Sequence, residues 1–282
     1  MTTRLRLDIA YDGSGFSGWS RQPALRTVQG VLEAALATVF ARSGPPPTLT
    51  VAGRTDAGVH ALAQVAHVDL TEEQLMSLAR RGDAGGASAL ARRLNGIAGL
   101  DSDVWVTSVT HAPAGFDARF SAVWRRYEYR LADAAGPRNP LERARTLWYP
   151  AELDLRAMDA AASGLVGLHD WAAYCKPREG ATTIRTLQDF RWARDAEGVL
   201  VATVQADAFC HSMVRALVGA TVAVGEGKLA PSGLTLLRDE LQRTSAFKVM
   251  PAKGLTLLRV GYPDDSELAV RAEQTRARRD AV

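Results

Sequence analysis

The stretch "AGRTDAGVH", residues 52–60, places several side chains that could do chemistry between two glycines. Gly53 and Gly58 permit positive φ angles and close approach of another backbone, so the residues between them can be held on a tight, exposed turn. A carboxylate held there, Asp56, could serve as a general acid or base or as a nucleophile. It could equally bond nearby backbone amides as a turn residue. A phosphate-binding loop is excluded, because its lysine and following serine or threonine are missing.

The elements that would position this loop are recognisable on both sides of it. Leu5, Leu7 and Ile9 alternate with charged residues, which predicts a strand with one buried face. Thr27 is an N-cap residue before an amphipathic helix, and Thr71 forms a capping box with Gln74. Further strands are predicted at 48–53, 64–70 and 103–109, with helices ending near 78 and 95.

The proline- and glycine-containing stretch "HAPAGFDARF", residues 111–120, is predicted to lead into a second unit. Strands are expected at 121–131, 186–192, 199–209 and 254–260, and helices at 154–168, 212–224 and 231–242. Both halves mix strands and helices at similar intervals, which favours an α+β fold of two related units with mostly antiparallel sheets. We expect an N-terminal α+β domain at 1–112 with the Asp56 loop, a C-terminal α+β domain at 113–264, and a charged tail at 265–282.

Composition sets wide limits on partners and location. The chain has 282 residues and a net charge of +3, from 34 basic and 31 acidic residues, which allows a polyanionic partner without demanding one. Cys175 and Cys210 lie far apart, so we expect two separate buried thiols in a reducing compartment rather than a zinc site or a disulfide framework. Arg4 and Arg6 interrupt the first apolar stretch and Arg215 the longest one, which argues against a signal peptide and a membrane span. A cytoplasmic location is expected.

Five blocks carry a family resemblance: "YDGSGFSGWSRQ", "AGRTDAGVHA", "FDARFSAVWRRYEYR", "AFCHSMVRALVG" and "KGLTLLRV". In this order, and over nearly the whole chain to about Pro263, they resemble the tRNA pseudouridine synthase A family. The resemblance implies the pseudouridine synthase fold, with the two units joined around a central basic cleft. It implies isomerisation of uridine to pseudouridine in the anticodon stem-loop of tRNA, at the family's sites, uridines 38, 39 and 40. It also implies a homodimer that needs no cofactor and no metal.

The same resemblance gives roles to four residues. Asp56 matches the family's catalytic aspartate, the nucleophile, which either adds covalently to the substrate or abstracts a sugar proton. Arg215 matches the arginine that keeps this carboxylate ionised, as an opposite charge within about 4 to 6 Å does. Tyr127 matches the tyrosine that stacks on the target base, and Leu255 an apolar residue that walls the pocket. Without the resemblance, Arg215 is typical of a helix surface, Tyr127 of a sheet face and Leu255 of a core.

Other residues are candidates for RNA contact. Arg54 matches the family residue suited to fill the gap left by a flipped base, because a guanidinium stacks on bases and pairs with phosphates. The remaining candidates for backbone contact are Arg21, Arg119, Arg125 and Arg126. His60 and His67 lack partners at a metal-binding spacing and are expected to support the loop. The chain departs from the family pattern at Ser20, Asp117, Cys210, Ser212 and Thr256.

Two other functions are compatible with parts of the pattern. A non-catalytic RNA-binding protein could use the same cleft, although binding alone has no use for a carboxylate beside RNA phosphates. A hydrolase based on Asp56 would need a second carboxylate, or a nucleophile with its base, and neither is evident. The presence of Asp56, Tyr127 and Arg215 together favours the isomerase.

Overall fold

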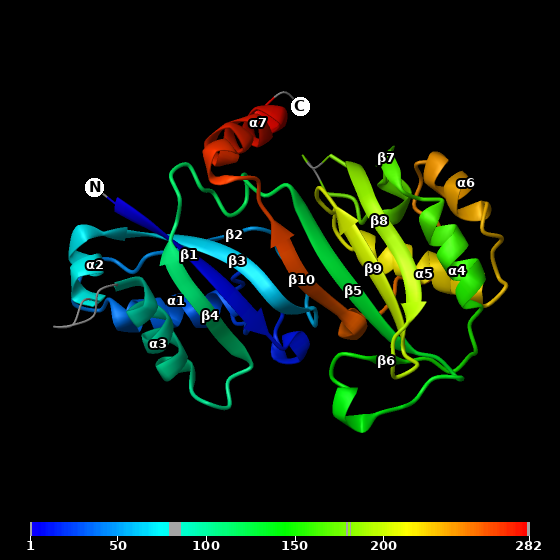
Figure 1. Cartoon of the computed structure of the whole chain (residues 1–282), viewed down its shortest axis with the longest axis horizontal. Helices are drawn as coiled ribbons and strands as arrows, with labels where there is room; N and C mark the ends of the chain where they lie inside the picture. Colours follow the sequence, from blue (N-terminus) through cyan, green and yellow to red (C-terminus); the bar gives the residue numbers. More distant parts are fainter. Residues whose placement is uncertain (1, 79–85, 179, 181, 281–282) are drawn as a thin grey trace. The chain divides into compact units, whose positions relative to one another are not determined.

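The computed structural model describes residues 2–78, 86–178, 180 and 182–280, and these form two compact units (Figure 1). The first unit comprises Met1–Val123 and Arg259–Val282, and the second comprises Trp124–Leu258. The expected domain limits at 112 and 264 differ from these. They stay a prediction, since the units are defined by contacts and not by independent folding.

The sheet of the first unit is centred on β1 (Thr2–Tyr11). This strand lies between β4 (Val104–His111) and β3 (His60–Thr71), and β2 (Leu49–Val51) pairs with β3; all these pairs are antiparallel. The predicted alternation is confirmed, because Leu5, Leu7 and Ile9 are fully buried while the charged residues between them are partly exposed. The strand therefore contributes one complete face to the core.

Both predicted helix starts in the first unit are confirmed. The Thr27 hydroxyl accepts a hydrogen bond from the Gly30 amide at the start of α1 (Val28–Val39). Before α2 (Glu72–Leu78), the Gln74 amide donates to the Thr71 hydroxyl at 3.2 Å, and the Thr71 amide donates to Gln74 Oε1 at 3.0 Å. Among the described residues of this unit, α3 (Gly86–Ala98) and α7 (Leu268–Asp280) are two further α-helices.

Residues 268–280, within the expected charged tail, form helix α7. Helix α7 lies in the first unit and buries Leu268 and Ala272 there. The Ser121 hydroxyl donates to the Leu268 carbonyl at 3.1 Å, and a side chain at Gly115 would meet the Cβ of Ala269. These contacts join α7 to the turn at residues 115–121.

The second unit contains a sheet in the order β5 (Trp124–Ala132), β9 (Leu200–Ala206), β8 (Ile184–Arg194) and β7 (Gly167–Asp170), all antiparallel, with β6 (Leu147–Trp148) parallel to β5. Helices α4 (Leu155–Ser163) and α5 (Met213–Gly225) pack together, and α6 (Gly233–Asp239) follows. Strand β10 (Leu255–Gly261) starts in this unit and ends in the first. The α+β class with mostly antiparallel strands is confirmed. None of the helices described is long and apolar enough to cross a membrane.

One helix is shorter than the sequence predicted. The spacing predicted a helix over 154–168, whereas α4 ends at Ser163 and is capped by Gly164. Gly167 then adopts a φ of 137°, a conformation that a helix cannot contain, and β7 begins there. Leu165, between these two glycines, is buried although it lies outside the helix. Its apolar side chain therefore continued the helical spacing and led the prediction too far.

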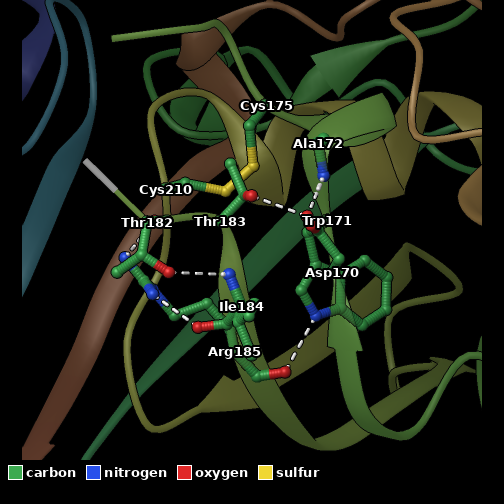
Figure 2. The surroundings of a disulfide bond; sticks show 9 residues. All are labelled: Asp170, Trp171, Ala172, Cys175, Thr182, Thr183, Ile184, Arg185 and Cys210. Atoms are coloured by element: carbon green, nitrogen blue, oxygen red, sulfur yellow. Dashed lines mark hydrogen bonds between the residues drawn. A yellow bond between two sulfur atoms is a disulfide. The ribbon is translucent and has the colours of Figure 1, made fainter. Parts of the chain in front are cut away.

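The expectation of two separate thiols is wrong, because Cys175 and Cys210 form a disulfide in the second unit (Figure 2). The two cysteines are 35 residues apart in the sequence, but their Cα atoms lie 5.7 Å apart, which is in the usual range for a disulfide. Cys175 follows the short helix η3 (Ala172–Tyr174), and Cys210 lies in the loop before α5. Near the disulfide, Asp170 Oδ1 accepts hydrogen bonds from the Thr183 hydroxyl at 2.6 Å and from the Ala172 amide at 3.0 Å.

Reduction of this disulfide should lower the free energy of unfolding. Opening a loop of this length typically costs roughly 2 to 4 kcal/mol, because the unfolded chain regains conformational freedom. Urea denaturation of the oxidised protein, with and without dithiothreitol, measures the difference. Cys210→Ser is the control, and its unfolding midpoint should not respond to reductant. An oxidised protein without free thiols whose midpoint is also insensitive to reductant would contradict this expectation.

Candidate active site

Asp56 lies on the loop between β2 and β3, and the glycine-rich segment 12–19 holds that loop by its backbone. The Trp19 amide donates to the Thr55 carbonyl at 3.0 Å, and the Gly58 amide donates to the Phe16 carbonyl at 3.2 Å. Asp56 itself is half-buried, between a buried Thr55 and an exposed Ala57. The backbone is thus fixed on both sides of the carboxylate.

Glycines permit this close approach between the two loops. A Cβ at Gly13 would lie 2.1 Å from the Val59 carbonyl oxygen, and one at Gly18 would lie 2.9 Å from the Thr55 carbonyl oxygen. Gly18 also has a φ of 89°, which disfavours any side chain. Within the motif, Gly58 has a positive φ of 79°, as its residue type permits. The carbonyl of Gly53 accepts a hydrogen bond from Gln64 Nε2.

Two histidines on β3, His60 beside this loop and His67 further along the strand, contact backbone amides. His60 is buried, and its Nδ1 accepts a hydrogen bond from the Gly13 amide at 3.1 Å. The same nitrogen lies 3.1 Å from Asp12 Oδ1. His67 Nδ1 accepts from the Ala118 amide at 3.0 Å. His60 therefore supports the segment that holds the Asp56 loop, as expected from the sequence. His67 instead supports the turn at residues 115–121, so the expectation that it supports the Asp56 loop is wrong.

In the second unit, Arg215 is held on α5 by a chain segment that crosses the helix. Its Nε donates to the Met250 carbonyl at 2.6 Å, and the Met250 amide donates back to the Arg215 carbonyl at 3.1 Å. One turn further along, a Cβ at Gly219 would lie 1.8 Å from the Lys248 carbonyl oxygen. Only glycine at this position allows the segment 248–250 to lie against the helix and fix the guanidinium.

The same segment connects Arg215 with β5 and with the start of β10. Tyr129 on β5 donates its hydroxyl hydrogen bond to the Pro251 carbonyl at 2.9 Å, and its ring leaves room only for glycine at Gly254. Leu255 follows directly and is buried. Burial raises the pKa of Tyr129 well above its ordinary value, while the positive charge of Arg215 opposes that rise. The elements carrying Tyr127, Arg215 and Leu255 therefore meet within the second unit.

Tyr127 is buried on β5, and its ring packs edge-on against Phe209, with centroids 5.3 Å apart. Sequence reasoning did not single out Phe209, although it is the second residue of "AFCHSMVRALVG" and directly precedes Cys210. An aromatic residue within that block was the feature of the sequence that could have identified Phe209 as a neighbour of Tyr127. Asp56 belongs to the first unit and the other three candidates to the second, so their approach to one another remains a prediction.

The five arginines predicted to contact RNA fall into two groups. Arg21, Arg54 and Arg119 are exposed in the first unit. Arg125 and Arg126 are half-buried in the second, where Arg125 Nη1 donates to the Asp207 carbonyl at 2.7 Å and Arg126 Nε donates to Gln205 Oε1 at 2.8 Å. RNA contact stays a prediction for all five.

Asp117, one of the residues that depart from the family pattern, has a structural role in the first unit. Its carboxylate accepts bonds from the Arg119 and Phe120 amides, both at 2.9 Å, and pairs with Arg276 of α7 at 2.8 Å. Burial alone would raise the pKa of Asp117, but these amides, His67 and Arg276 together hold it below its ordinary value. This departure from the family pattern therefore anchors the C-terminal helix.

Comparison with known proteins agrees with the features described above. The chain matches the family described as tRNA pseudouridine synthase over residues 9–84 and 161–263. It is 67% identical to the tRNA pseudouridine synthase A of Leifsonia xyli subsp. xyli over 98% of both chains. It is 56% identical to that of Frankia casuarinae, over 97% of this chain and 94% of the relative, and 48% identical to that of Mycobacterium leprae, with the same coverage. The chain belongs to the tRNA pseudouridine synthase family.

Proposed function

We propose that this chain isomerises uridines 38, 39 and 40 in the anticodon stem-loop of tRNA, with Asp56 as the nucleophile. As a member of its family, the chain is an isomerase that converts uridine to pseudouridine in tRNA. The observation that supports Asp56 is its loop, whose backbone is held on both sides of the carboxylate by the segment 12–19. Such fixed placement is what an attacking group requires.

In the proposed reaction, an Asp56 oxygen bonds to the substrate as the glycosidic bond to N1 breaks, and the bonding electrons leave with the uracil ring. The ring turns, its C5 forms the new bond to the sugar and the carboxylate departs. C5 then loses its proton and N1 takes one up, so the product is an isomer of the substrate. Tyr127 stacks on the base, Arg215 balances the charge of Asp56, and Leu255 excludes water from the pocket. A carboxylate confined beside the substrate needs such a cation to stay ionised.

The proposal extends to the RNA and to assembly. Arg54 fills the gap left by the flipped base, while Arg21, Arg119, Arg125 and Arg126 contact the phosphate backbone. The enzyme works as a cytoplasmic homodimer, as the resemblance implies, because one tRNA is large compared with a single chain. The alternative, an RNA-binding protein without catalysis, shares the basic surface and lacks the chemistry.

Purified protein incubated with unmodified tRNA transcripts tests the proposal. Each transcript carries uridine at only one of positions 38, 39 and 40, and a matched transcript has cytidine at all three. Chemical mapping should find pseudouridine at the anticodon-arm position in the first set and none in the control. Binding of every transcript without any pseudouridine would support the non-catalytic alternative, and modification elsewhere would overturn the proposed sites.

A further inference from the structure

We propose that the buried hydrogen bond between Tyr11 and Thr55, supported by Gln64, positions the Asp56 carboxylate for catalysis. The inference rests on the proposed role of Asp56. It assigns positioning residues that touch neither the substrate nor the reacting atoms. All of these groups lie within the first unit.

Thr55 directly precedes Asp56 and is fixed through both its side chain and its backbone. Its hydroxyl lies 2.8 Å from the Tyr11 hydroxyl, and its carbonyl accepts the hydrogen bond from the Trp19 amide. Only 6% of Thr55 is exposed, and a β-branched side chain has restricted rotation about χ1. The hydroxyl contact therefore orients the peptide that leads into Asp56.

Tyr11 follows an irregularity at the end of β1, and its hydroxyl reaches Thr55 in the loop. The register between β1 and β3 shifts between Ile9 and Tyr11, and such bulges redirect side chains next to functional sites. The Tyr11 ring packs against Phe16 and Trp19, with centroid distances of 6.4 and 6.1 Å. Phe16 and Trp19 are the residues whose backbones hold the Asp56 loop, so one aromatic cluster supports both loops.

Gln64 connects the Tyr11 hydroxyl with the other end of the loop. Its Nε2 lies 3.3 Å from the Tyr11 oxygen and 2.8 Å from the Gly53 carbonyl oxygen. Because the Gln64 Nε2 can only donate, the Tyr11 oxygen accepts from it and the Tyr11 proton is available to Thr55. Burial raises the pKa of Tyr11 to about 12, which keeps the phenol protonated at neutral pH. The three side chains thus form a buried chain of hydrogen bonds from Gly53 to Thr55.

The test is the substitution Thr55→Val, which keeps the shape of the side chain and removes its hydroxyl, compared with Thr55→Ser, which keeps the hydroxyl. In Thr55→Val we expect kcat to fall roughly 10- to 100-fold, because small displacements of a reacting group have effects of this size. The KM for tRNA should stay within about threefold, since the hydroxyl makes no contact with RNA. Thr55→Ser should retain most of the activity. Tyr11→Phe should behave like Thr55→Val, and the double variant should lose no more than either single one.

Tyr262→Phe is the matched control, because Tyr262 is a partly buried tyrosine of the same unit whose hydroxyl donates to the Ala118 carbonyl at 2.7 Å. It should lower stability as Tyr11→Phe does and leave kcat unchanged. The proposal is overturned if Thr55→Val keeps wild-type kcat, if its loss appears only in KM, or if Tyr262→Phe lowers kcat equally. Asp56→Asn is assayed alongside: if it is active, the proposed function fails, whereas an inactive Asp56→Asn with an active Thr55→Val overturns the positioning role alone.

Discussion

Replacing Asp56 with asparagine should abolish release of tritium from uracil C5 in labelled tRNA while leaving tRNA binding intact. The substitution keeps the size of the side chain and removes its charge and its nucleophilic oxygen. A loss of at least about 10³-fold is expected, since removing a nucleophile or general base has effects of this order or larger. Filter binding of the same tRNA should give a dissociation constant close to that of the wild type.

The control for this experiment is Asp101→Asn, which changes an exposed aspartate of the same unit. It should release tritium at the wild-type rate. Release by Asp56→Asn within about tenfold of the wild type would contradict the assignment, because such a small loss is typical of an indirect effect. Loss of tRNA binding together with turnover would show that Asp56 acts in recognition instead.

Arg215→Met should have the second largest effect on turnover. The substitution removes the proposed counter-charge of Asp56 and the hydrogen bond from Nε to the Met250 carbonyl. Loss of one such electrostatic group typically lowers kcat by about 10² to 10³, or about 2.7 to 4 kcal/mol. Single-turnover kinetics with saturating enzyme separate this loss from tRNA binding.

Two variants distinguish a charge effect from a structural one. Arg215→Lys keeps the charge without the planar guanidinium and should recover part of the rate, since the two side chains are not equivalent in geometry. Arg156→Met removes an exposed arginine from α4 of the same unit and should leave kcat unchanged. If Arg215→Met lowers the free energy of unfolding while kcat stays at the wild-type value, Arg215 serves only to hold the segment 248–250.

Local patterns predicted the fold well where one side chain interaction decides the structure. The buried face of β1 and the caps at Thr27 and Thr71 follow from residue type and spacing, and the structure confirms all three. The end of α4 did not follow, because Leu165 continues the apolar spacing beyond the glycine that stops the helix. The disulfide was missed for a similar reason, since spacing along the chain carries no information about two loops that meet in space.

In the candidate site too, the sequence predicted local features but not contacts between distant segments. The sequence blocks identified the candidate residues, whereas the contacts that hold these residues in place could not be predicted from the sequence. Tyr11 and Thr55 are 44 residues apart, and the segment at Met250 reaches Arg215 across 35 residues. Beside each of these contacts, a glycine lets two backbone segments approach closely: Gly18 faces the Thr55 carbonyl, and Gly219 faces the Lys248 carbonyl. A glycine in a sequence does not state which backbone will approach it.

Mapping pseudouridine in the tRNAs of cells that lack the gene, complemented with wild-type or Asp56→Asn protein, tests the central claim most directly. The account predicts that pseudouridine at positions 38, 39 and 40 disappears from the deletion strain, returns with the wild-type gene, and stays absent with Asp56→Asn. Unchanged pseudouridine in the deletion strain, or its return with Asp56→Asn, would contradict it.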